Sequence, residues 1–298
     1  MASAQLASDT IGQDAAPAAS SAAVWGKRAR KNWAALLAIL FLLSVAILAI
    51  VPALFGVADP LVTAPRDAFL PPSRMYPFGT DDLGRDLLSR TIYGARVSLG
   101  TALAVVIAAA ALGVPIGLIA GYREGVADAL LMRAIDVVLA FPAILLAMGL
   151  IAVIGTGWVN GALAVTIVSI PAFARLARAS VMQEKVREYV VAARTIGAGT
   201  PRILFRAILP NCLGPLLVQA AFVATWAILL EASLSFLGLG VSPPTPSWGQ
   251  MLSAGKTNLY RAWWYGFFPG LALTLVVLSL NTIGETTQRV IRKGWRST

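Results

Sequence analysis

Six apolar runs, each about long enough to cross a bilayer, constrain the fold of this 298-residue chain more than any other feature. A hydrocarbon core of about 30 Å requires about 20 apolar residues in a helix. The runs lie near Ala34–Phe55, Val97–Gly121, Ala134–Ile154, Gly161–Leu176, Pro215–Leu237 and Trp264–Ile283. The fourth run is the shortest. We predict an all-α membrane protein with about six transmembrane helices.

The composition supports a chain that uses lipid as its solvent. It is 58% hydrophobic and 13% charged, whereas a soluble domain has roughly 25% charged residues. There is one cysteine, Cys212, and no histidine. This inventory excludes disulfide frameworks, Cys/His zinc sites, Ser-His-Asp triads and histidine proton relays. We therefore expect no catalytic residues, no metal and no cofactor in this chain.

The basic residues predict the orientation. Most of the 24 Lys and Arg residues fall on one side if the N-terminus is cytoplasmic, so the positive-inside rule puts both termini in the cytoplasm. Because these residues separate apolar runs, the net charge of +10 reflects topology rather than nucleic-acid binding. The expected parts are a disordered basic tail (1–33), a first transmembrane helix (34–55), an extracytoplasmic loop with a short helix (56–96), a core of five transmembrane helices (97–285) and a cytoplasmic tail (286–298).

The cytoplasmic loop 175–211, within the core, has the pattern of helix, turn and helix. Gly197 permits positive φ at a helix end, Thr200 can cap the next helix, and Pro201 fits its first turn. Pro210 is expected to end that helix. The pattern alone leaves two interpretations open: a basic helix that lies on lipid headgroups, or a helix that inserts into a groove on a partner protein.

The sequence VAARTIG followed by ILP resembles the corresponding loop of ABC importer permeases. Their pattern is Glu-Ala-Ala, three residues, Gly, nine residues, Ile, one residue and Leu-Pro. The positions in register are Ala192, Ala193, Gly197, Leu209 and Pro210. Val191 stands where the pattern has Glu and Ala207 where it has Ile, so roles of those two side chains do not carry over. Glu188 lies one turn earlier and is a candidate substitute for the missing Glu.

The resemblance implies that this loop is a coupling helix that docks into a cleft of a cytoplasmic ATPase subunit. The candidate coupling residues are Glu188, Ala192, Ala193, Gly197, Arg202, Leu209 and Pro210. Small residues suit docking because they let two backbones approach closely. The alternative is that the same small residues serve tight helix packing within this chain.

Two further segments narrow the resemblance from ABC importer permeases in general to one family of them. The segment PFGTDDLGRDLLSRTIYGARVSLG begins at Pro77, and LSFLGLGVSPPTPSWGQMLSAG begins at Leu234. With the central loop, they resemble the dipeptide and oligopeptide (and nickel) permease family, in the subunit with a long first extracytoplasmic loop. The similarity extends from about Trp33 to Ile283. It implies the type I ABC importer permease fold in a bacterial cytoplasmic (inner) membrane.

The family resemblance also implies partners and a cargo. The expected partners are a paralogous permease subunit, two ATPase subunits that bind ATP and magnesium, an extracytoplasmic substrate-binding protein and membrane lipid, with no nucleic acid. The expected function is ATP-driven import of dipeptides or oligopeptides. A nickel-chelate or glutathione importer of the same family is an alternative. An ion-coupled secondary transporter is a further one, although it would be expected to show more inward-facing acids or histidines.

Acidic residues occur at two other places. Thr80 or Asp81 is expected to cap a short helix near Asp82, with Asp86 and Arg90 as an i,i+4 pair. A calcium site is the alternative, but the spacing lacks the EF-hand alternation of oxygen ligands.

Glu231 is the carboxylate inside a confidently placed span. An intramembrane acid is a functional candidate by default, so Glu231 is a candidate for the translocation pathway. The equally weighted alternative is a hydrogen bond to a neighbouring helix, for example through Ser279 or Asn281.

Overall fold

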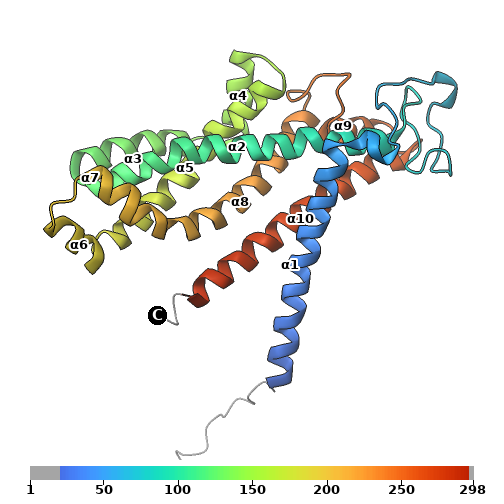
Figure 1. Ribbon diagram of the computed structural model, residues 1–298. Coiled ribbons are helices and arrows are strands. Elements are labelled where there is room, and N and C mark those ends of the chain that lie inside the picture. Colours follow the sequence, from blue (N-terminus) through green and yellow to red (C-terminus); the bar gives the residue numbers. More distant parts are fainter. Residues whose placement is uncertain (1–20, 295–298) are drawn as a thin grey trace, which may run out of the picture.

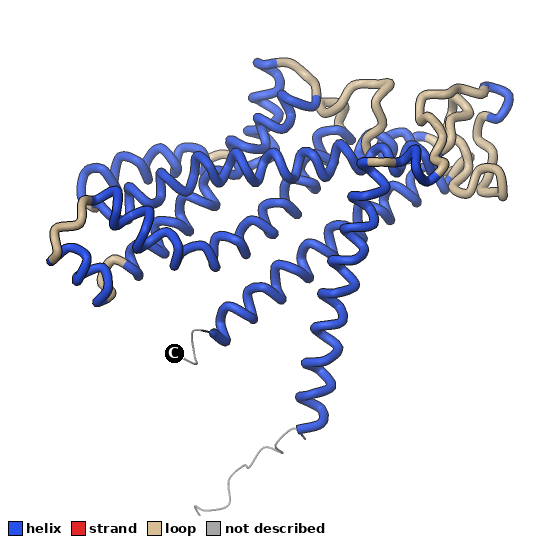
Figure 2. The backbone as a smooth tube through the Cα atoms, viewed as in Figure 1, coloured by secondary structure: helices blue, strands red, loops and turns tan. Residues whose placement is uncertain are grey.

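A computed structural model describes residues 21–294, which are largely helical (Figures 1 and 2). The α-helices are α1 (Ser21–Ile50), α2 (Leu87–Arg123), α3 (Gly125–Leu139), α4 (Ala143–Ile154), α5 (Trp158–Glu184), α6 (Glu188–Thr195), α7 (Thr200–Arg202), α8 (Leu209–Phe236), α9 (Trp248–Thr257) and α10 (Trp263–Gly294). Shorter turns are the 3-10 helices η1 (Pro52–Phe55) and η2 (Pro65–Asp67) and the π-helix η3 (Ile203–Ile208). Residues 21–294 contain no strand beyond one isolated bridge between Thr80 and Asp86.

Five helical stretches are long and apolar enough to cross a membrane: Trp33–Ile50, Leu87–Arg123, Trp158–Glu184, Thr200–Phe236 and Trp263–Ile291. A sixth span exists only if α3 and α4 are taken together, because they are bent by 87° at a short break. Pro142 is the N-cap of α4 and explains the break. Proline disfavours helical geometry in the preceding residue and lacks the amide that a continuous helix needs. The predicted third run is therefore a broken pair.

The helices extend beyond the apolar runs from which they were predicted. Helix α1 already begins within the predicted tail, α2 begins within the predicted outer loop, and α10 continues into the predicted C-terminal tail. Apolar runs mark the part of a helix that lies in lipid, whereas the backbone hydrogen bonds continue into polar sequence at both ends. Residues 1–20 and 295–298 of the two predicted tails lie outside the described residues.

Helices α2 and α5 pack side by side as the central pair of the molecule (Figure 1). Gly113, Gly117 and Gly121 lie one turn apart on α2 and face α5. A Cβ atom at Gly117 would come within 2.3 Å of the Ala174 carbonyl oxygen. Three glycines at this spacing allow the two backbones to approach closely, which is how membrane helices gain dispersion contacts without a hydrophobic driving force. We call α2 and α5 the central pair.

Helix α3 is fastened to α5 by ion pairs. The Arg178 guanidinium donates two hydrogen bonds of 2.6 Å to the Asp128 carboxylate, and Arg175 lies 2.7 Å from Asp136. A two-bond arginine–carboxylate contact fixes the direction as well as the distance. These contacts hold α3 against α5.

Residues 51–86, which we call the outer segment, join α1 to α2. Asp81 is fully buried there, 2.6 Å from Arg85 Nε and 3.4 Å from Arg90 Nε. The outer segment is also fastened to α10, because Trp264 Nε1 donates to the Thr80 carbonyl oxygen and the Tyr265 hydroxyl donates to Asp82. It is thus a folded platform rather than a loose loop.

The capping prediction for the outer segment is wrong in detail. Asp86, rather than Thr80 or Asp81, caps a helix, and that helix is α2, which begins at the next residue. The Asp86 carboxylate accepts hydrogen bonds from the amides of Leu88 and Ser89. Arg90 pairs with Asp81 instead of Asp86. The spacing that suggested an i,i+4 pair is outweighed by the amides at the helix start, which offer the carboxylate a better site.

Candidate coupling site

Helix α6 lies at the opposite end of α2 from the outer segment (Figure 1). It connects the end of α5 to the helical stretch that continues through α7 and η3 into α8. We call residues 185–202 the coupling segment.

One side of α6 is anchored and the other is exposed. Buried side chains of α2, α4, α5 and α8 form a hydrophobic cluster, which we call the main hydrophobic cluster. Val190 is fully buried and packs into this cluster together with Ile203 and Ile208. Val191 and Ile196, by contrast, are 51% and 84% exposed. Anchorage on one face and exposed apolar side chains on the other are what an α-helix shows when it docks into a groove on a partner.

Gly197 ends α6 in a left-handed conformation. Its φ is +77°, its amide donates to the Arg194 carbonyl oxygen, and the Ala198 amide donates to that of Ala193. Glycine adopts this conformation without the strain that a Cβ atom brings. A Cβ atom at Gly197 would meet nothing within 4 Å in this chain. The glycine is therefore required here by backbone conformation and not by packing within the chain.

The next helix starts and continues differently from the prediction. Its N-cap is Gly199, and the Thr200 side chain makes no capping bond, although Pro201 does lie in the first turn. Pro210 does not end the helix, because the π-helix η3 precedes it and the chain continues as α8. Proline lacks an amide hydrogen and clashes with the carbonyl four residues earlier; a widened π turn relieves both problems.

The seven candidate coupling residues fall into two groups. Five are exposed, namely Glu188, Ala192, Gly197, Arg202 and Pro210. Ala193 and Leu209 are half-buried and pack against the main hydrophobic cluster. The exposed group is available to a partner, whereas the half-buried pair supports the segment from within.

A polar contact that the sequence did not reveal joins α6 to two other helices. The Tyr189 hydroxyl donates a 2.6 Å hydrogen bond to Glu184 at the end of α5. The Asn211 side chain, on α8, donates to the same hydroxyl at 3.1 Å and to the Ala207 carbonyl oxygen at 2.8 Å. Burial and the Glu184 carboxylate raise the pKa of Tyr189 well above its usual value, so the phenol keeps its proton. The sequence gives no sign of this contact, because it depends on how the start of α8 lies beside the end of α5.

Glu231 lies on α8 and is only 6% exposed. Ser98 Oγ on α2 donates to its carboxylate at 3.1 Å, and Ser235 Oγ donates at 2.7 Å. The predicted partners are wrong, since the Ser279 hydroxyl donates to the Leu275 carbonyl oxygen. The expected hydrogen bond to a neighbouring helix is present, but that helix is α2, and only the packing of α2 against α8 could identify Ser98.

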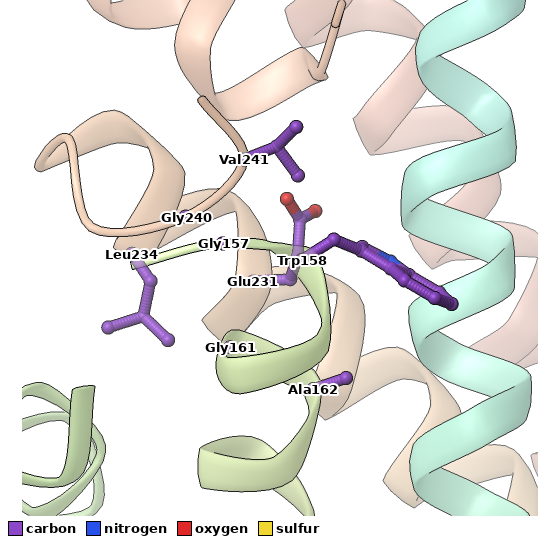
Figure 3. Close-up of a pocket in the computed structure, with 8 residues that line it drawn as sticks. All are labelled: Gly157, Trp158, Gly161, Ala162, Glu231, Leu234, Gly240 and Val241. Carbon is purple, nitrogen blue, oxygen red and sulfur yellow. The ribbon is translucent and has the colours of Figure 1, made fainter. Parts of the chain in front are cut away.

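Glu231 borders a small cavity of about 10 Å³. Figure 3 shows the carboxylate between the Trp158 side chain and Val241, beside the loop that carries Gly240. A volume of this size holds about one water molecule. Trp158 and Val241 also line a wider hollow of about 470 Å³. In the described part of the chain, no three His, Cys, Asp or Glu side chains gather as a metal site would require.

Comparison with solved structures supports the fold class. The chain superposes on inward-facing conformations of the MetNI methionine ABC transporter with a TM-score of 0.55, over 70% of this chain and 97% of that one, at 18% identity. The helical arrangement is therefore the type I importer permease fold.

Sequence comparison then identifies the family. Residues 113–297 match the family described as binding-protein-dependent transport system inner membrane component. The chain is 50% identical over 207 residues to the Di/tripeptide transport system permease protein DppC of Pseudomonas aeruginosa, covering 70% of this chain and 68% of the relative. It is 40% identical over 262 residues to the Dipeptide transport system permease protein DppC of Haemophilus influenzae, covering 86% and 89%. The chain belongs to this family and is a permease subunit of an ABC importer.

Proposed function

We propose that this permease imports dipeptides or oligopeptides across a bacterial inner membrane. The observation that carries the cargo proposal is the similarity to relatives named as dipeptide and di/tripeptide permeases, which reaches 50% identity and extends over most of their length. Nickel chelates and glutathione are alternative cargoes within the same class of transporter. Ion-coupled transport is a weaker alternative, since it leaves the exposed coupling segment without a role.

Each end of the molecule offers a surface to a different proposed partner. Two cytoplasmic ATPase subunits bind ATP and magnesium, and one of them docks on the exposed face of α6, where Val191 and Ile196 offer apolar surface. A loaded substrate-binding protein docks on the side of the outer segment. A paralogous permease completes the cavity. This chain contributes no catalytic residue to ATP hydrolysis.

The proposed mechanism is alternating access between two arrangements of the paired permeases. Closure of the ATPase subunits moves α6, and the movement reaches the membrane through the helices that hold it. The central pair carries the movement outward because its glycine contacts allow little sliding between α2 and α5. Differential binding of ATP favours the closed arrangement, and hydrolysis of ATP by the partner subunits supplies the free energy of transport.

Transport by the purified complex of both permeases and two ATPase subunits in proteoliposomes, with the binding protein added, tests this function. We expect uptake of a labelled dipeptide that requires ATP and the binding protein and persists without a pH or sodium gradient. Competition by unlabelled tripeptide, glutathione and a nickel chelate ranks the cargoes. Uptake that follows an ion gradient without ATP would refute the importer mechanism, and competition only by the nickel chelate would refute the peptide cargo.

Glu231 remains our proposal for a residue beside the translocation pathway. Gly157, Trp158 and Val241 line both the small cavity beside its carboxylate and the wider hollow, so movement of the Trp158 or Val241 side chain would connect the two. Glu231→Gln retains a side chain that can hydrogen-bond to both serines. We expect normal complex assembly and several-fold slower uptake, while Ser233→Ala leaves uptake unchanged, because Ser233 is half-buried on the same helix and its hydroxyl donates to the Leu229 carbonyl oxygen. Unaltered uptake by Glu231→Gln would remove this residue from the pathway.

A further inference from the structure

Three polar side chains from three helices meet where the coupling segment joins the membrane helices. Tyr189 is on α6, Glu184 is the last residue of α5, and Asn211 is in the first turn of α8. The Tyr189 hydroxyl donates to Glu184 at 2.6 Å and accepts from Asn211 at 3.1 Å. We call this contact the tyrosine bridge. The Tyr189 hydroxyl of α6 is thereby hydrogen-bonded to side chains of two transmembrane helices, α5 and α8.

Each end of the tyrosine bridge is held in place. Glu184 is only 5% exposed, and Arg187 Nε lies 3.9 Å from the other carboxylate oxygen. Asn211 is fixed by its second hydrogen bond, 2.8 Å to the Ala207 carbonyl oxygen within η3. A buried carboxylate that loses a donor is costly, so Glu184 holds the hydroxyl firmly.

The tyrosine bridge differs from the apolar anchor beside it. Val190 holds α6 against the main hydrophobic cluster through apolar contacts, which have no preferred direction. Hydrogen bonds have a preferred angle. The bridge is therefore the contact that can transmit a displacement of α6 in a defined direction.

We propose that Tyr189 is a positioning residue for coupling, through which movement of α6 pulls α5 and α8 together. This inference rests on the proposed docking of an ATPase subunit on α6. It gives the aromatic ring and the hydroxyl separate tasks: the ring supports the segment, and the hydroxyl links it to the two spans.

The test is Tyr189→Phe in the complete reconstituted complex, because phenylalanine keeps the ring and removes only the hydroxyl. The readouts are the number of dipeptides imported per ATP hydrolysed and the stimulation of ATP hydrolysis by loaded binding protein. We expect the ratio to fall about three- to tenfold, the effect of about one net hydrogen bond. The KM for ATP and the yield of assembled complex should not change.

Tyr122→Phe is the matched control. Tyr122 lies on α2, near the same end of the molecule, and its ring stacks against the Arg194 guanidinium 5.1 Å away. Its substitution removes a phenolic hydroxyl without touching the tyrosine bridge, so the transport ratio should stay at the wild-type value.

Glu184 provides a second, independent pair of variants. Glu184→Gln keeps an oxygen that accepts from the Tyr189 hydroxyl and should retain most of the coupling, whereas Glu184→Ala should match Tyr189→Phe. If Glu184→Gln and Glu184→Ala were equally impaired, the charge of Glu184 rather than the bridge would be responsible, and the proposal would fail.

The outcomes separate this inference from the proposed function. If wild-type complex imports dipeptide with ATP and Tyr189→Phe has an unchanged ratio, the tyrosine bridge has no coupling role. If Tyr189→Phe instead loses its ATPase subunits during purification, the hydroxyl serves docking and the inference is overturned as well. If wild-type complex shows no ATP-dependent uptake, the proposed function itself is wrong.

Discussion

The outer segment and the coupling segment lie at opposite ends of α2 and are built in contrasting ways. The outer segment buries Asp81 completely, and the carboxylate pairs with Arg85 of the same segment and with Arg90 at the start of α2. The coupling segment exposes Val191 and Ile196 and is held by a buried valine and the tyrosine bridge. The outer end is held together by buried, paired charges, whereas the coupling end is held by one buried apolar side chain and one polar contact.

The contrast indicates where substitutions should act on folding and where they should act on coupling. Charges that are buried and paired are sensitive because loss of one partner leaves the others without compensation. Exposed side chains contribute little to the folded chain by itself, and their effect appears when a partner binds. Stability should therefore depend mainly on the outer segment and the central pair, and coupling on the segment around α6.

Asp81→Ala should have the largest effect on stability. It removes the carboxylate from Arg85 and Arg90, of which Arg90 is itself buried. Loss of one member of a buried ion pair costs about 3–5 kcal/mol. We expect a large drop in the amount of folded permease, measured by size-exclusion chromatography in detergent after a heating series.

Asp59→Ala is the control for Asp81→Ala, because Asp59 is exposed and only accepts a hydrogen bond from the nearby Leu61 amide. It should change stability by less than about 1 kcal/mol. If both variants lost the same amount of folded permease, the buried ion pairs would not stabilise the outer segment more than a surface residue does. The proposed contrast between the two ends would then be wrong.

Gly117→Ala should have the next largest effect, because it acts on the central pair that joins the two ends. The new methyl group would lie 2.3 Å from the Ala174 carbonyl oxygen, so α2 and α5 must separate. Overpacking of this kind costs about 1–3 kcal/mol. The same heating series should show the lower transition temperature, and transport per ATP should fall with it.

Gly149→Ala on α4 is the matched control for Gly117→Ala. Gly149 is helical, and a Cβ atom there would meet nothing within 4 Å. Alanine should be neutral or stabilising by up to about 1 kcal/mol through helix propensity. If both variants behaved alike, the close approach of α2 to α5 would not limit stability.

The apolar runs predicted the membrane helices because lipid imposes a length and a composition that are readable in sequence. They did not predict where helices begin and end in polar sequence, as at Leu87. Nor did they predict that α3 and α4 are bent against each other, since Pro142 signals a kink but not its angle. The glycine spacing at 113, 117 and 121 is readable in the sequence, because small residues one helical turn apart are typical of closely packed membrane helices.

The coupling site was predictable only in part. The order of helix, turn and helix was readable from Gly197 and Pro201, whose backbone preferences are local. The continuation past Pro210 was not, because the π-helix that accommodates the proline depends on the surrounding packing. The Ser98–Glu231 bond joins residues far apart in sequence, and the tyrosine bridge depends on how α8 packs beside the end of α5, so only the fold reveals them.

Gly197→Ala should have the smallest effect of the three substitutions, and it tests the coupling end of the comparison. A Cβ atom finds open space in this chain but is strained at φ +77°, which costs about 1 kcal/mol. We expect near-normal folding in the heating series and at most an about fivefold lower ratio of dipeptide imported to ATP hydrolysed, since 1 kcal/mol corresponds to roughly that factor. Asparagine, which tolerates this conformation better, should impair coupling less than alanine.

Gly199→Ala separates the strain of the backbone from the bulk of the side chain. Gly199 lies two residues further along the same exposed turn, with φ −67°, and the nearest atom to its added Cβ is 4.0 Å away. Alanine fits that conformation, so transport per ATP should match the wild type. If Gly199→Ala were as impaired as Gly197→Ala, close approach of the ATPase subunit to the whole turn, rather than the left-handed conformation at Gly197, would set the requirement for small residues. That result would extend the docking surface beyond α6 to the turn that follows it.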